Sequence, residues 1–138
     1  MAETGKFDEI LISLRKHYEC PVAMAGIIRK GVYDHIAVSG APMMTGLDAK
    51  NLPCGLAVRR RLPVVIEDLE GWDALASLDL DGGEPRFYAG ARFDAPDGAE
   101  GVVALLDIRA RPMALRELGE LAEAAAHLAV ALDETAHE

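Results

Sequence analysis

The amino-acid sequence predicts a single α+β domain with a helix near each end of the chain and short strands between them. Apolar residues recur at helical spacing in both end segments. Short apolar runs with few charges lie between these segments, and turns that contain glycine or proline separate the runs. The chain has 138 residues without an internal repeat or linker, so we expect one domain over residues 1–138.

The first predicted helix has its start capped by Thr4 and ends at Cys20-Pro21, because the residue before a proline avoids the α region. Its apolar face consists of Phe7, Ile10, Leu11, Leu14 and Tyr18. This spacing is typical of a helix that packs one side against a core.

A predicted hairpin follows, with strands over Val22–Ile28 and Val32–Ser39 and a turn at Lys30-Gly31. Strict alternation along the second strand puts Ile36 and Val38 on one face and His35 and Ala37 on the other.

The middle of the chain is predicted to be less regular. Residues 40–51 are expected to form a loop with an apolar centre at Met43-Met44, before a short helix over 52–61. A strand over 62–66 has to lie at a sheet edge or contain Pro63 among its first residues, because proline cannot donate a ladder hydrogen bond. The acidic stretch 68–80 can form a helical turn around Trp72, and 79–85 is a turn-rich connector.

Two further strands and a long helix complete the prediction. Strands over 86–93 and 101–108 are joined at Pro96-Asp97-Gly98, and the second is apolar on both faces, as a central strand would be. The helix over 114–133 carries an apolar seam, flanked by the small residues Ala122, Ala126 and Ala129. The seam consists of Leu118, Leu121, Ala125, Leu128 and Leu132, and off it lie Ala124, Val130 and Ala131. This excess of apolar surface favours a homodimer through the terminal helices.

Composition excludes several classes of function. The net charge is −9, with 14 basic against 23 acidic residues, so a nucleic-acid binder is not expected. The one basic run, Arg59-Arg60-Arg61, suits the solvated end of a helix better than a phosphate site. No apolar stretch is long enough to span a membrane and no secretory pattern is present at the start, so we expect a cytoplasmic protein with reduced Cys20 and Cys54. No spacing of cysteine and histidine indicates a metal site.

Four segments in the same order resemble the GAF domain family. They are Cys54-Gly55-Leu56-Ala57-Val58, Leu62-Pro63-Val64-Val65-Ile66-Glu67-Asp68, Arg86-Phe87-Tyr88-Ala89-Gly90-Ala91, and Pro96-Asp97-Gly98 followed by Gly101 and Leu105-Leu106-Asp107. The resemblance covers residues 7–132. It implies a central antiparallel sheet of five or six strands, with the terminal helices on one face and a loop-lined pocket on the other. The short segment between Asp68 and Arg86 is a departure that argues against a large chromophore.

The resemblance, together with residue chemistry, gives six candidate ligand-binding residues. Met43, Met44 and Trp72 lie in segments that wall the pocket in relatives, although they could equally pack the loops over the sheet. Tyr88 is the better pocket candidate of the pair Phe87 and Tyr88, because a buried tyrosine hydroxyl needs a partner. Two candidates remain: Cys54, either a pocket thiol or a small buried hydrophobe, and Arg86, either a ligand clamp with Asp68 or half of a structural ion pair.

We therefore expect a regulatory small-ligand sensor module in signal transduction, not an enzyme, acting through a helix-mediated dimer. A protein-interaction or dimerisation module with a vestigial pocket is the alternative, with a regulatory protein as its partner. A thiol-dependent reductase of the free methionine sulfoxide reductase type is a third possibility, although the cysteine motifs of those enzymes are missing. No cofactor is implied.

Overall fold

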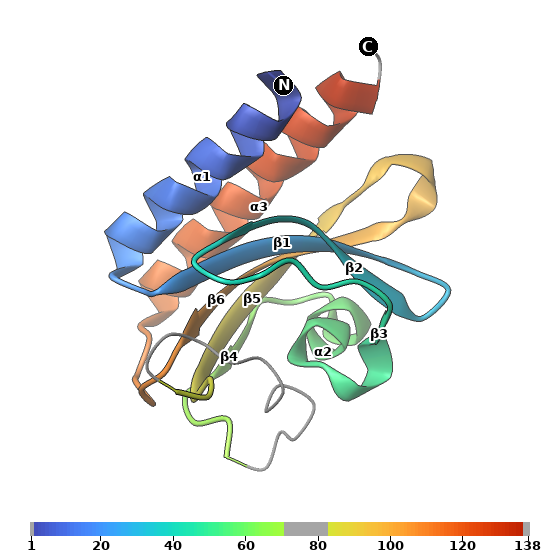
Figure 1. The fold of residues 1–138 in the computed structure, drawn as a ribbon. Helices are drawn as coiled ribbons and strands as arrows, with labels where there is room; N and C mark the ends of the chain where they lie inside the picture. Colours follow the sequence, from blue (N-terminus) through green and yellow to red (C-terminus); the bar gives the residue numbers. More distant parts are fainter. Residues whose placement is uncertain (1, 71–82, 137–138) are drawn as a thin grey trace.

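The computed structural model describes residues 2–70 and 83–136 as three layers: a pair of helices, a curled sheet, and a short helix beyond it (Figure 1). In chain order the elements are α1 (Ala2–Tyr18), β1 (Val22–Arg29), β2 (Val32–Ser39), β3 (Leu47–Asp48), α2 (Pro53–Arg60), β4 (Val64–Ile66), β5 (Phe87–Asp94), β6 (Glu100–Asp107) and α3 (Leu115–Ala136). Short 3₁₀ turns occupy Ala49–Asn51 and Pro96–Gly98. The α+β class predicted from the sequence is confirmed.

The strands form one antiparallel sheet in the order β3-β2-β1-β6-β5-β4. The predicted pairing of the 86–93 and 101–108 segments is confirmed, because β5 and β6 run antiparallel from Phe87 opposite Asp107 to Asp94 opposite Glu100. β6 lies between β1 and β5, and its residues from Gly101 to Asp107 are all buried, as the continuous apolar run predicted. β4 lies at an edge, which agrees with Pro63 just before it.

Two apolar clusters cover the two faces of the sheet. α1 and α3 lie side by side on one face (Figure 1), and their buried residues, among them Leu11, Leu121 and Leu128, pack on Phe87 and its neighbours. On the opposite face, α2 packs on β5 and β6 around Tyr88 and Cys54. Phe87 and Tyr88 therefore pack on opposite faces of the sheet, as their alternation along the strand predicted.

Three details of the sequence prediction are wrong. Thr4 lies inside α1 rather than at its start, because the helix extends back to Ala2. Residues 40–51 are not wholly irregular, since Leu47–Asp48 pairs with β2 as β3. The third error is in the faces of β2: a register shift opposite Ala25 and Gly26 leaves Ile36 without a partner, so strict alternation fails there. Ile36 consequently packs with the terminal helices, whereas Val38 packs on the α2 side.

A buried ion pair joins the end of α1 to the sheet. Asp107, at the end of β6, is 2% exposed and accepts a hydrogen bond of 3.0 Å from Arg111 Nη1. The same guanidinium donates to the carbonyl oxygen of Tyr18 at 2.8 Å and lies over the ring of Phe87, 5.5 Å from its centroid. Through these contacts Arg111, four residues before α3 begins, links the end of α1 to β5 and β6.

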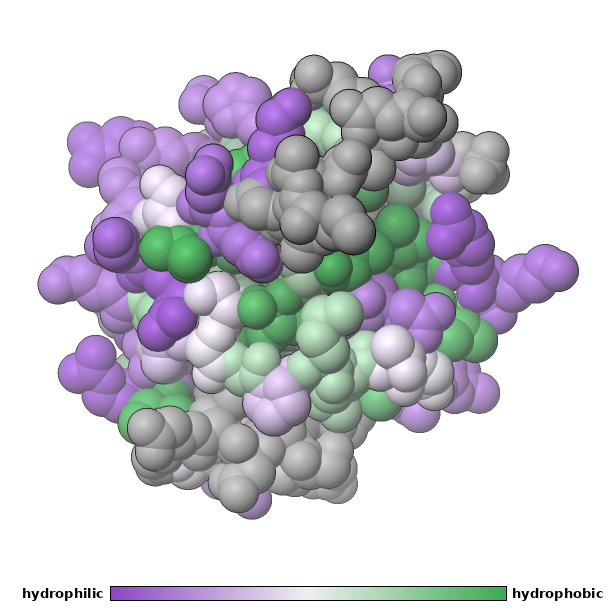
Figure 2. All heavy atoms as spheres, turned by 45° about the horizontal axis from the view of Figure 1, so that its top comes forward, coloured by the Kyte–Doolittle hydropathy of each residue, from purple (hydrophilic) through white to green (hydrophobic). Residues whose placement is uncertain are grey.

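The surface carries apolar residues as well as charge. With the ends of α1 and α3 turned forward, Figure 2 shows green, apolar residues gathered across the middle of the face and hydrophilic residues at its margins. The exposed large apolar side chains of the terminal helices are Ile12, Leu115 and Val130. No helix among the described residues is both long enough and apolar enough to cross a membrane.

Candidate functional site

Two tyrosine rings and one thiol meet beneath α2. Tyr33 reaches the cluster from β2, Tyr88 from β5 and Cys54 from the first turn of α2, and each of them is at most 1% exposed. The Tyr88 hydroxyl donates to Cys54 Sγ at 3.2 Å. The structure thus brings the predicted residues Cys54 and Tyr88 together, and it adds Tyr33, which the sequence analysis did not select.

Two glycines make room for the rings. An added Cβ at Gly26 would overlap the ring and the hydroxyl of Tyr33, and one at Gly90 would overlap the Tyr88 hydroxyl. Both rings therefore lie close over the sheet, each above a glycine. Gly26 is opposite His35 and diagonal to Tyr33, so a glycine within the first strand of the hairpin is the signal in the sequence that could have pointed to a close-packed ring there.

Burial keeps the cluster uncharged. It raises the pKa of the Cys54 thiol to about 11, although the hydroxyls of Tyr88 and Tyr33 beside the sulfur act in the opposite direction. It also raises the pKa of Tyr33 and of Tyr88 well above the ordinary value, and the neighbouring thiol adds to both effects. All three groups stay protonated at neutral pH, so Cys54 lacks the thiolate that a nucleophilic cysteine needs.

The Tyr33 hydroxyl differs from the other two groups. It faces the same thiol, and this contact adds to the rise in the pKa of Tyr33, but its oxygen makes no hydrogen bond of regular geometry with the residues that the structure describes. Cys54 Sγ already accepts from Tyr88, at the geometry given above. A buried hydroxyl without a well-aligned hydrogen bond contributes less to stability than one that has such a bond.

His35 connects the cluster to the Met43-Met44 loop. Its Nδ1 accepts the backbone N–H of Met44 at 2.9 Å, and its own backbone N–H donates to the Met44 carbonyl oxygen at 3.0 Å. Because Nδ1 is an acceptor, Nε2 carries the proton, and it lies 3.3 Å from Met24 Sδ. The His35 ring also packs edge-on against Tyr33, with 5.2 Å between centroids. Burial lowers the pKa of His35 to about 4, so the ring is neutral at physiological pH.

The two loop methionines differ in position. Met44 is partly buried against the apolar cluster on the α2 side, whereas the side chain of Met43 is 57% exposed. Of the predicted pocket walls, Met44 is thus joined to the cluster through His35 and Met43 is not. Trp72 lies outside the described residues.

Arg86 and Asp68 form the predicted ion pair. Arg86 donates from Nε to Oδ1 at 3.0 Å and from Nη2 to Oδ2 at 2.9 Å, a two-pronged contact. The Arg86 guanidinium holds the pKa of the Asp68 carboxyl below its usual range. Backbone bonds from Leu69 N–H to the Arg86 carbonyl and from Arg86 N–H to the Asp107 carbonyl, both 2.7 Å, continue the sheet at this point. Both side chains are nearly half exposed, at 44% and 45%, so the pair lies at the rim of the domain.

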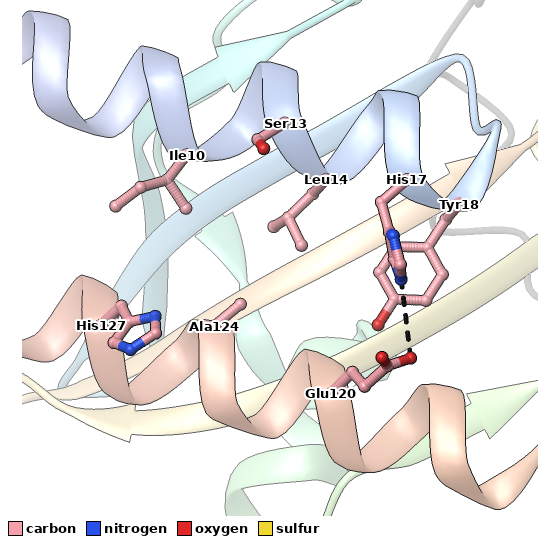
Figure 3. Close-up of a pocket in the computed structure, with 8 residues that line it drawn as sticks. All are labelled: Ile10, Ser13, Leu14, His17, Tyr18, Glu120, Ala124 and His127. Carbon is pink, nitrogen blue, oxygen red and sulfur yellow. Dashed lines mark ion pairs between the residues drawn. The ribbon is translucent and has the colours of Figure 1, made fainter.

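A groove of about 290 Å³ runs between the terminal helices (Figure 3). Ile10, Leu14 and Ala124 form its apolar part. His17 points across it toward Glu120, with Nε2 and Oε1 3.5 Å apart, and both side chains are exposed. The sequence analysis treated these helices only as packing surfaces and did not identify the groove, since it depends on how far apart the two helices lie.

Cys20, the second cysteine, lies in the apolar cluster between the sheet and the terminal helices. Cys20 is 5% exposed, and burial raises its pKa to about 11 while the nearby Arg111 acts against this. Arg111 Nη1 lies 3.4 Å from its sulfur. Both cysteines are free, as expected. Among the described residues, no group of three or more acidic, histidine or cysteine side chains could hold a metal ion.

Comparison with known proteins identifies the fold. No protein-family model matches the sequence, and no curated protein matches it significantly. Among solved structures, the chain is similar to the GAF domain of a phosphoenolpyruvate-protein phosphotransferase from Acinetobacter, with TM-score 0.74 and 15% identity over 93% of this chain and 80% of that one. It is also similar to the PixJ GAF domain of Thermosynechococcus elongatus, with TM-score 0.75 and 15% identity over 99% and 88%.

A third structure with this fold is an enzyme. The type II free methionine-R-sulfoxide reductase of Thermoplasma acidophilum matches with TM-score 0.77 and 12% identity, over 96% of this chain and 93% of that one. At such low identities the comparisons establish the fold and leave the function open. The chain therefore has a GAF-domain fold, as the sequence motifs indicated.

Proposed function

We propose that this chain is a regulatory small-ligand sensor module in signal transduction, and that its ligand binds between the sheet and α2. The observation that carries the proposal is the buried group of Tyr33, Cys54 and Tyr88, in which two hydroxyls and one thiol converge and the Tyr33 hydroxyl makes no hydrogen bond of regular geometry among the described residues. An apolar site with a few convergent polar groups is typical of small-molecule recognition. Met44, tied to the same cluster through His35, belongs to this proposed site.

Native mass spectrometry of the gently purified protein tests the sensor function. We expect a retained small molecule in a fraction of the protein, and its release after denaturation and refolding. The refolded protein should then melt at a lower temperature than the original preparation, because a bound ligand stabilises the folded state by mass action. Identical masses and melting temperatures before and after refolding contradict the proposal.

We further propose that the module acts as a homodimer through α1 and α3, in the cytoplasm. The groove between these helices and the exposed Ile12 and Val130 support a helix-mediated interface. Part of the apolar surface counted from the sequence is core, however, since Leu128 is fully buried and Ala131 is 4% exposed. The interface would then rest on fewer residues than the seam suggested.

Val130→Glu is the sharper test of the dimer, because Val130 is 58% exposed and its replacement leaves the core intact. Light scattering at high micromolar concentration should show a dimer for the wild type and a monomer for this variant. Val32→Glu is the matched control, since Val32 is an exposed valine on β2. A wild-type protein that is monomeric at that concentration contradicts the dimer.

The alternative is an interaction module whose terminal helices dock a regulatory protein and whose pocket is vestigial. The same groove favours it. A monomeric chain that retains no small molecule is the result that distinguishes this module from the sensor.

A thiol-dependent reductase is disfavoured by the chemistry of the two cysteines that the sequence contains. Both are buried, and burial raises the pKa of each to about 11, so little thiolate forms at neutral pH. Incubation with free methionine sulfoxide and dithiothreitol should give no turnover. Turnover that Cys54→Ser abolishes would establish the enzyme and remove the non-catalytic interpretation.

A further inference from the structure

An imidazole and a carboxylate face each other across one end of the groove between the terminal helices. His17 Nε2 of α1 lies 3.5 Å from Glu120 Oε1 of α3, and the two side chains are 57% and 44% exposed (Figure 3). The His17 ring packs edge-on against the ring of Tyr18, with 4.8 Å between centroids. The imidazole is therefore held by a neighbouring ring, and the pair is accessible to ions from solution.

The spacing of these two atoms suits two ligands of one metal ion. Charge-assisted hydrogen bonds join such groups at about 2.7–2.9 Å, and the observed 3.5 Å is longer. Zn²⁺ binds imidazole nitrogen and carboxylate oxygen at about 2.1 Å. Two ligands at that radius and 3.5 Å apart subtend about 113° at the ion, close to the tetrahedral angle of about 109°. Zinc therefore fits between them without a movement of either helix.

The charge around the pair favours a cation. Tyr18 lines the same end of the groove, and its pKa is raised to about 12 by burial first and then by nearby carboxylates, Glu120 and Glu117 before Glu123. Carboxylates that disfavour a negative charge at this place attract a positive one. This electrostatic observation is independent of the distance between His17 and Glu120.

Two ligands do not complete a zinc site. Zinc takes four ligands in structural sites, and catalytic sites use three from the protein. Among the described residues, no third acidic, histidine or cysteine side chain joins the pair to form such a group. His127 lines the same groove but at its other end, two turns or about 10 Å along α3 from Glu120 (Figure 3). The missing ligand therefore has to come from another molecule.

A second copy of the chain supplies this ligand when the two grooves face each other. In an isologous dimer whose two-fold axis crosses the groove, the His127 end of each copy lies over the His17 and Glu120 end of the other. This orientation also keeps the two acidic ends apart, whereas an axis along the groove would bring Glu120 of both copies together. Charge therefore favours the first arrangement.

We propose that Zn²⁺, or a divalent transition-metal ion with similar ligand preferences, links two copies of this protein through His17 and Glu120 of one copy and His127 of the other. Each dimer then holds two identical sites, one at either end of the paired grooves. A water molecule completes each tetrahedron, as in other sites with three protein ligands. This inference rests on the proposed homodimer and adds to it a metal ion that strengthens the association.

Light scattering and metal analysis test the bridge. The protein is treated with EDTA, and its dimerisation is then followed with and without equimolar ZnCl₂. We expect zinc to lower the concentration of half-dimerisation tenfold or more and to remain bound at about one ion per chain. Mg²⁺ prefers oxygen ligands and should have no effect at the same concentration.

Variants of the three ligands should lose this response and remain folded by circular dichroism, because His17, Glu120 and His127 are exposed. His17→Ala and His127→Ala should each abolish the effect of zinc, although the two residues lie on different helices. Glu120→Gln should weaken the effect tenfold or more. Glu9→Gln is the matched control and should respond as the wild type does, since Glu9 is an exposed carboxylate of α1 outside the groove lining.

An equal mixture of His17→Ala and His127→Ala is the sharpest test. A heterodimer of the two contains one intact site, because the second variant provides His17 and Glu120 while the first provides His127. Zinc should therefore dimerise the mixture, at about one ion per two chains, and should not dimerise either variant alone.

Each contrary result has its own meaning. Zinc binding that survives His17→Ala, or a mixture that zinc does not dimerise, overturns the shared site. One ion per two wild-type chains, unaffected by His127→Ala, shows that like ends meet and removes His127 from the site. A dimer of equal strength in EDTA and in zinc leaves the homodimer standing without its metal. A chain that stays monomeric in both overturns the bridge and the homodimer together.

Discussion

Protonation of His35 should weaken the fold as the pH falls below 6.5. In the folded protein burial lowers the pKa of His35 to about 4, whereas an exposed histidine has its ordinary value of 6.5. Between these two values the unfolded chain binds a proton that the folded protein does not, so stability is full above pH 6.5 and decreases toward pH 4. Protonation would also place a hydrogen on Nδ1, where the N–H of Met44 now donates.

The size of the effect follows from the two pKa values. Their difference of about 2.5 units sets an upper limit of about 3 kcal/mol, and lowering the pH from 8 to 5 should lower the free energy of unfolding by about 2 kcal/mol through His35. The Met43-Met44 loop should loosen first, because the bond from Met44 N–H cannot form to a protonated ring.

Urea denaturation at pH 8 and at pH 5 measures this change. His35→Asn is the reference variant, because Asn Oδ1 can accept the Met44 N–H in place of Nδ1 but does not titrate. It should be less stable than the wild type at pH 8 and should lose about 2 kcal/mol less on going to pH 5. His127→Asn, a change at an exposed histidine of α3, should show the wild-type loss. Equal losses in the wild type and His35→Asn would refute the reasoning.

Three further predictions concern other contacts of the fold. Arg111→Ala should destabilise the protein by about 3 kcal/mol, because it takes the nearer of two guanidinium partners from the carboxylate of Asp107, which is 2% exposed. Leu128→Ala should lower the free energy of unfolding by about 3 kcal/mol, since the leucine is fully buried and leaves a cavity. Arg86→Ala should lower the melting temperature slightly and leave ligand affinity unchanged, because Arg86 pairs with Asp68 at the exposed rim.

Each of these has a control and a contrary outcome. Arg109→Ala removes the other guanidinium near Asp107, which is 77% exposed and 3.9 Å from the carboxylate, and should cost much less in the same urea titration; equal losses in both arginine variants would remove the special role of Arg111. Leu115→Ala replaces an 85% exposed leucine of α3 and should change stability by less than about 0.5 kcal/mol. If Arg86→Ala abolishes ligand binding while the melting temperature holds, the clamp interpretation of the ion pair is right.

Local features of the sequence determined much of this architecture. The helices, the hairpin of β1 and β2, and the pairing of β5 with β6 follow from apolar periodicity and turn residues, which act over a few neighbouring positions. The edge position of β4 follows from Pro63, which is also a local feature. The central position of β6 follows in the same way from its apolar run without charges. The partnership of Arg86 and Asp68 was also foreseen, since each lies at the end of a strand expected in the same sheet.

Only the tertiary structure decided where the remaining polar side chains meet. The bulge at Ile36 changes the face on which the residues of β2 lie, and it depends on pairing with β1, which strict alternation along one strand does not contain. Tyr33 and His35 share a face by alternation, and the packing of α2 on the sheet brings that face to Cys54 and Tyr88. The sequence by itself thus determined which residues form helices and strands, because those choices depend on near neighbours. The buried cluster and the groove between α1 and α3 depend on contacts between distant segments, and only their packing in three dimensions brings those residues together.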